Sequence, residues 1–237
     1  MNNTDRKSRR EFLRMSAGLG AGVLLAGCTG GSVGTGGAGA PQQEADILPV
    51  EDLMREHGLL VRIALIYEEC LRRLDAGGEA PLPSLSEAAG IVRRFVEDYH
   101  EKLEEEFVFP RFAGAGELAA LAATLKAQHQ AGRDVTDVVI RLSARKALAG
   151  DEPRQLQAAI RQFLRMYYPH LAREDTVLFP AFHDRVPPRE YDQLGDRFED
   201  RENQLFGDHG FEHMVEKVAT IEKALGIYDL ARFTPKA

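Results

Sequence analysis

The chain has no tryptophan, only two cysteines among its 237 residues, and no uninterrupted apolar run of the about 20 residues that a membrane-spanning helix needs. After residue 27 it also has no basic cluster. Residues 28–237 contain 25 basic and 35 acidic side chains, a net charge of −10. An acidic domain of this kind argues against a nucleic-acid partner. We expect Cys70 to be a small buried residue without a disulfide partner.

The first 46 residues have the composition of an export signal followed by a flexible linker. Arg6, Lys7, Arg9 and Arg10 precede a short, glycine-diluted apolar run that ends in Leu-Ala-Gly before Cys28. A basic start followed by a short apolar stretch is typical of an export signal. The following segment, 29–46, is rich in Gly, Ser, Ala and Gln, and it cannot bury enough surface to fold. We therefore predict a signal peptide at 1–27, a flexible tether at 28–46 and a folded domain at 47–237.

Two short motifs indicate the type of export signal. The stretch from Ser8 to Leu13, Ser-Arg-Arg-x-Phe-Leu, resembles the twin-arginine export motif, and Leu-Ala-Gly-Cys at 25–28 resembles a lipobox. The resemblance implies cleavage before Cys28, a lipid on its thiol and a location outside the cytoplasm, anchored to a membrane. The twin-arginine route exports folded proteins.

The most informative feature of the folded part is a repeated motif. His100 and Glu104 are followed by acids and then Phe-Pro-x-Phe, and the same pattern recurs further along the chain at His170 and Glu174. Residues i and i+4 lie on the same face of a helix. Each repeat therefore directs one imidazole and one carboxylate to the same point, as in the core metal sites of helix bundles.

The apolar periodicity predicts an all-α fold, an antiparallel up-down four-helix bundle over 48–182. One or two further C-terminal helices are expected over 187–226. The first three bundle helices are expected at about 49–76, 84–109 (with a Ser84–Glu87 capping box) and 117–149, and the fourth begins after an Asp151 cap. The additional helices are expected at 187–205 and 211–225.

Two lone histidines lie in the inner stripes of the first and third helices. The interval from His57 to His129 is nearly the same as that between the two repeats. A single histidine in a stripe is more often a core residue than a ligand, but this duplication favours ligands. Gly132, one turn beyond His129, leaves room for a close neighbour. We expect His209 and His213 on the surface and His183 in a loop, and interpret Glu105 and Glu106 as a solvated acidic turn.

Over residues 48–182 the pattern resembles the hemerythrin-like (HHE cation-binding) family. The resemblance implies a non-haem di-iron centre with His57, His100, His129 and His170 as terminal ligands and Glu104 and Glu174 as bridges. The chain departs from the oxygen-carrying hemerythrins, because Arg133 stands where they have a further histidine. They also use an acid at the fifth position after the last histidine, so that Asp175 is an alternative to Glu174.

These features support several functions. The first is an exported, membrane-tethered di-iron protein that binds or senses a small diatomic ligand, oxygen or nitric oxide. The alternatives are a di-iron oxidoreductase acting on nitric oxide or peroxide, an iron-binding or storage module without turnover, and a metal-free bundle. Manganese or zinc in place of iron stays open. Turnover needs an electron donor, and the sequence indicates neither a second cofactor nor a docking patch for one.

Overall fold

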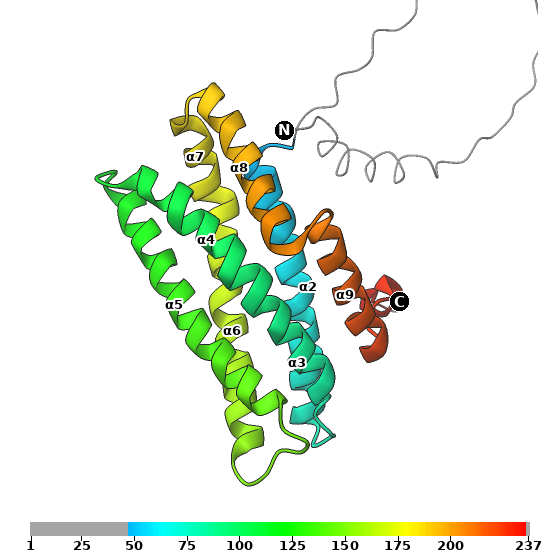
Figure 1. Cartoon of the computed structure of the whole chain (residues 1–237). Helices are drawn as coiled ribbons and strands as arrows, with labels where there is room; N and C mark the ends of the chain where they lie inside the picture. The colour runs from blue at the N-terminus through cyan, green and yellow to red at the C-terminus, as the bar shows by residue number, and fades with distance from the viewer. Residues whose placement is uncertain (1–46, 236–237) are drawn as a thin grey trace, which may run out of the picture. The chain divides into compact units, whose positions relative to one another are not determined.

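The computed structural model describes residues 47–235, and within this range the chain is all α-helical, without strands (Figure 1). This confirms the predicted fold class. The predicted signal peptide, the lipidation site Cys28 and the tether, residues 1–46, lie outside the described residues. The described residues from Leu48 onward form one compact unit.

The elements up to Arg185 form four long helical rods that pack side by side, and short connections reverse the chain between them (Figure 1). The first and third rods are single helices, and the second and fourth are composite. In chain order the rods are α2 (Pro49–Asp75); α3 (Leu82–Ile91), η2 (Val92–His100), α4 (Glu101–Leu103), η3 (Glu104–Val108) and η4 (Phe109–Phe112); α5 (Glu117–Ser143); and α6 (Glu152–Arg173), η5 (Glu174–Leu178) and α7 (Phe179–Arg185).

The core forms where the apolar stripes of the four rods meet. α5 packs against α6, α2 against α6, and α3 against α5. Leu60 and Tyr67 of α2, Phe95 of η2 and Phe163 of α6 are almost completely buried. Each of these residues belongs to a row of buried apolar side chains with helical spacing, so each helix presents one apolar face to the bundle axis.

Two further helices cover one side of the bundle. α8 (Pro188–Phe206) packs against α2, and α9 (Gly210–Leu225) packs against α2 and α3 (Figure 1). The Phe206 ring contacts the rings of Phe95 and Tyr99 in η2, with centroids 5.4 and 5.6 Å apart. The 3₁₀ turn η6 (Leu230–Phe233) follows. The expected C-terminal helices are thus present.

Three local predictions were wrong. The second rod begins at Leu82 after Pro81, without the Ser84 capping box, because proline at the start needs no capped N–H. α5 ends at Ser143 rather than near 149. His183 lies in α7 and not in a loop, because the chain continues helically through Pro180 as far as Arg185.

None of the helices within residues 47–235 is both long enough and apolar enough to cross a membrane.

Candidate metal centre

The six residues predicted as ligands meet in the core of the bundle, and each of them is buried. They form two groups, and within each group the potential ligand atoms lie within 4.8 Å of one another. Each rod contributes to the cluster: α2 gives one histidine, the second rod a His/Glu pair, α5 one histidine and the fourth rod a His/Glu pair. The groups are His57, His100 and Glu104, and His129, His170 and Glu174.

Each carboxylate faces histidines of both groups. Glu104 Oε1 lies 3.6 Å from His100 Nε2 and Oε2 lies 3.4 Å from His129 Nε2. Glu174 Oε2 lies 3.0 Å from His170 Nε2 and 3.5 Å from His57 Nε2. Both glutamates therefore lie between the two histidine pairs, where a bridging ligand must lie.

The inward-facing atoms have no other role among the described residues. Both carboxylate oxygens of Glu104 and Glu174, and Nε2 of His57 and His129, are buried without a hydrogen-bond partner. A buried carboxylate without a partner is costly. Two donors about 2.1 Å from a shared cation, at angles of about 90–120°, are about 3.0–3.6 Å apart. The observed separations fall in or near this range, so these residues fit a pair of cations.

The outward nitrogen of each of the four clustered histidines lies beside an oxygen acceptor. Nδ1 of His57 lies 2.7 Å from Asp175, and that of His100 lies 2.7 Å from Glu56. Nδ1 of His129 lies 3.2 Å from Glu105, and that of His170 lies 2.9 Å from Gln128. Such contacts fix the tautomer with Nδ1 protonated and leave Nε2 free to coordinate.

These four acceptors repeat the internal duplication of the chain. Glu56 and Gln128 each precede a lone histidine and contact the histidine of the next His/Glu pair along the chain. Glu105 and Asp175 each follow the glutamate of a pair and contact the lone histidine of the other half. The acceptors therefore repeat along the chain at the same intervals as the histidines and glutamates next to them in sequence. The whole site, including its supporting contacts, is built twice.

The backbone around the glutamates repeats as well. Glu104 and Glu174 each begin a π-helical turn, η3 and η5. π-turns inside α-helices are rare and occur frequently at functional sites. Both turns precede a Phe-Pro pair, whose proline cannot donate a backbone hydrogen bond.

The position that departs from the oxygen carriers contributes a cation instead of a ligand. The Arg133 guanidinium lies 2.7 Å from both Glu101 Oε2 and Glu105 Oε1. Glu101 also accepts a 2.8 Å hydrogen bond from the Tyr167 hydroxyl. Arg133 therefore balances two acids beside His129 and holds Glu105 in place.

The close neighbour of Gly132 is Tyr167. A Cβ at Gly132 would lie only 2.3 Å from the Tyr167 hydroxyl oxygen. The Tyr167 hydroxyl can reach Glu101 because Gly132 has no side chain in its way.

Burial sets the protonation of the site. It lowers the pKa of His170 to about 2, helped by the neighbouring imidazoles, so that this ring is neutral as a metal ligand must be. Burial, with the charge of Glu104 added, raises the pKa of Glu174. Burial also lowers the pKa of His129, yet the carboxylates of Glu104 and Glu105 raise it to about 9. A cation in the centre would replace these protons.

Sequence reasoning missed part of the supporting layer. The interpretation of Glu105 as solvated was wrong, since its side chain is only 12% exposed and contacts His129 and Arg133. Glu106 is exposed, as expected. Asp175, the alternative ligand, lies behind His57, while Glu174 faces inward. The signal that could have found these residues is the duplication of the positions flanking the ligands.

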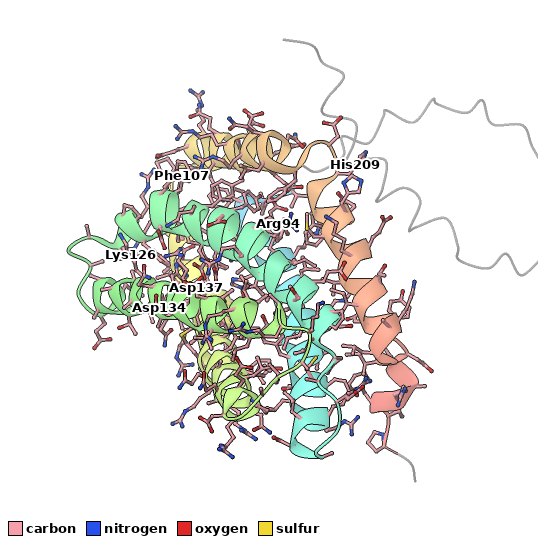
Figure 2. All side chains as sticks on the ribbon, turned by 60° about the horizontal axis from the view of Figure 1, so that its bottom comes forward. Arg94, Phe107, Lys126, Asp134, Asp137 and His209 are labelled. Carbon is pink, nitrogen blue, oxygen red and sulfur yellow. The ribbon has the colours of Figure 1, made fainter. Side chains whose placement is uncertain are left out.

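The remaining chemistry-bearing residues lie away from the centre. His209 precedes α9 in a left-handed conformation, and His213 is exposed (Figure 2 shows His209 at the junction of α8 and α9). Neither histidine belongs to the groups of potential ligands that form the cluster. Cys70 is buried and forms no disulfide within residues 47–235, and burial raises the pKa of its thiol to about 12.

Fold and site together define a four-helix bundle with a buried histidine–glutamate site for cations. The chain belongs to the hemerythrin HHE cation binding domain family, whose domain matches residues 48–182 and, in an overlapping placement, residues 123–213. The second placement begins shortly before His129, much as the first begins shortly before His57. The two placements therefore follow the internal duplication.

The chain is also similar over nearly its whole length to proteins of mycobacteria. It is 46% identical over 232 residues to an uncharacterized protein of Mycobacterium bovis and to uncharacterized proteins of two strains of Mycobacterium tuberculosis. The alignments cover 96% of this chain and 91% of each relative. No solved structure matches the chain.

Proposed function

We propose that the protein holds two iron ions in this cluster and uses them to bind or sense a small diatomic molecule, oxygen or nitric oxide. The observation that carries the proposal is the set of inward-facing carboxylate and imidazole atoms without hydrogen-bond partners. Four imidazoles and two carboxylates form a mixed nitrogen and oxygen donor set, which is compatible with iron.

The distances indicate which residues would hold each of the two irons. His57 and His100 would hold one iron and His129 and His170 the other, with Glu104 and Glu174 shared by both. When bound, the iron pair supplies electrons and open coordination positions for a diatomic ligand. The protein residues keep water out, orient the imidazoles through their Nδ1 contacts and balance the cationic charge.

Arg133 bears on which ligand chemistry is favoured. With arginine at this position, each half of the site has two histidines, and an iron held there would have no third histidine. A less fully ligated iron retains positions for a small molecule. This favours reactivity with nitric oxide or peroxide over reversible oxygen carriage, and it keeps a di-iron oxidoreductase as the second candidate function. A storage module without turnover would show neither reactivity.

We further propose that the protein acts outside the cytoplasm, tethered through a lipid on Cys28. The support is the basic start, the apolar run and the Leu-Ala-Gly-Cys sequence of residues 1–28. Replacing Cys28 by serine should release the protein from the membrane fraction. Retention of the C28S variant in that fraction would contradict the tether.

The functional proposal is tested by titrating nitric oxide and oxygen separately into the reduced, iron-loaded protein. A binding or sensing protein should show saturable spectral changes that reverse when the gas is removed. Consumption of nitric oxide or peroxide over many turnovers with an added electron donor would establish the oxidoreductase instead. No change with any of them would leave the storage module.

A further inference from the structure

A small apolar pocket opens at the surface beside the His129 half of the centre. Its volume is about 250 Å³, and it lies between the η3–η4 end of the second rod and the first turns of α5. Four alanines and two phenylalanines form most of its wall, with Glu105 and Lys126 as the charged members. Figure 2 shows Lys126 near the end of the bundle where the second rod turns back into α5.

One layer of side chains separates this pocket from a metal ligand. Phe109, which lines the pocket, is 7% exposed, and its ring centroid lies 5.3 Å from that of His129. Glu105, which also lines it, lies 3.2 Å from His129 Nδ1. Both residues therefore touch the pocket on one side and the ligand histidine on the other.

The pocket has the size and polarity for a small uncharged molecule. Pockets for drug-sized ligands have volumes of about 300–1,000 Å³, so this one is small for a larger organic substrate. Apolar cavities take up uncharged guests such as xenon. A larger pocket of about 580 Å³, lined by Arg94, Phe206 and His213, contains none of the cluster residues or their Nδ1 partners.

We propose that this alanine-lined pocket is the access route by which a small uncharged diatomic molecule reaches the His129 side of the centre, with Phe109 as the gating side chain. The role of the route rests on the proposed function, whereas occupation of the pocket by an apolar guest does not. The alanines at 119 and 123 are positions where a longer side chain would close the route without touching a ligand. Ala119 is partly exposed and Ala123 exposed, so both tolerate enlargement better than buried Ala122.

The first test uses xenon as an apolar probe of the full-length chain, with no need for iron. Xenon NMR should detect a saturable site in the wild-type chain. The site should be lost in A119L and A123L and kept in A120L, the matched control. Ala120 is exposed on the same helix and does not line the pocket. An unchanged xenon site in both pocket variants, or no site in the wild type, would overturn the proposal.

The second test measures the rate of nitric oxide association with the reduced, iron-loaded full-length chain. In A119L and A123L the rate constant should fall at least about tenfold, the change produced by a barrier higher by about 1.4 kcal/mol. Iron content should stay the same, and A120L should match the wild type. Wild-type rates in both pocket variants would refute the access route. If the chain holds no iron, the proposed function fails, and the xenon experiment still decides whether the pocket takes an apolar guest.

Discussion

Replacing Glu174 by leucine should change stability in opposite directions with and without metal. Glu174 is completely buried, and neither of its oxygens has a hydrogen-bond partner among residues 47–235. Burial and the charge of Glu104 raise its pKa, so the ionised side chain is unfavourable in the metal-free protein. Burying a polar group without a hydrogen bond costs about 1–3 kcal/mol in mutational data, and a leucine of similar volume removes that cost. We expect metal-free E174L to gain stability in that range.

Iron should reverse the order of the two proteins. A ligand that binds only the folded state at 100 times its dissociation constant stabilises that state by about 2.7 kcal/mol. The wild type should gain at least this much, whereas the variant has lost a carboxylate shared by both halves of the site and should gain little. At 1,000 times the dissociation constant the gain is about 4.1 kcal/mol, which exceeds the range expected for E174L, so the wild type becomes the more stable of the two.

The assay is urea denaturation followed by circular dichroism, once with a chelator and once with ferrous iron under anaerobic conditions. The control is E106L, because exposed Glu106 belongs to the same π-turn as Glu104 and its carboxylate lies 3.0 Å from the Arg201 guanidinium at the surface. Exposed ion pairs contribute about 0–1 kcal/mol, so E106L should stay within about 1 kcal/mol of the wild type in both conditions. Lower stability of E174L with chelator, or equal stabilisation of E174L and wild type by iron, would refute the reasoning.

Three further predictions follow from the surroundings of the site. Burial raises the pKa of Glu97 from 4.5 to about 7, so its contribution to stability is present below pH 4.5 and is lost as the pH rises to 7. The loss amounts to about 3 kcal/mol, and E97Q should flatten the pH dependence of urea midpoints across this window. G132A should destabilise the fold by about 1–3 kcal/mol, because the added methyl group would overlap with Tyr167. If that contact is the cause, thermal melts of the G132A/Y167F double variant should show a loss smaller than the sum of the two single losses. Q128A should lower iron affinity about 10- to 100-fold in a chelator competition, while Q130A, an exposed neighbour whose amide donates to Asp134 over 3.0 Å, should leave it unchanged.

Helical periodicity and duplication were sufficient to predict the bundle and the inner residues of the cluster. His170 and Glu174 occur within the apolar stripe of their helix, and a buried acid in such a stripe demands a partner. The same pattern earlier in the chain, at His100 and Glu104, indicated that two such faces meet. Local periodicity carries this information because residues i and i+4 share a face whatever the neighbouring helix is.

The supporting layer depends on neighbouring helices and could not be predicted from one helix at a time. Glu105 is adjacent in sequence to Glu104 and points about 100° away from it, toward what a single helix would present as solvent. Only the position of α5, with His129 and Arg133, turns that direction into an interface. Glu56 and Gln128 were missed for the same reason.

The end of α5 shows a similar limit. Residues 144–149 are mostly alanine, leucine and basic residues, which favour helix, so propensity predicted a longer α5. In the structure this segment turns toward α6. Arg145 lies 3.5 Å from Glu152, and the backbone N–H of Ala149 donates to the same carboxylate. The turn that lets α6 pack back against the bundle therefore ends α5 earlier than helix propensity alone predicts.

The most direct test of the central claim is the iron content of residues 47–237 produced with iron and purified without oxygen. The account predicts two irons per polypeptide, retained in E106A and lost in E104A while the helical circular dichroism spectrum persists. Absence of iron after reconstitution under reducing conditions, or full retention in E104A, would contradict a di-iron centre at these six residues.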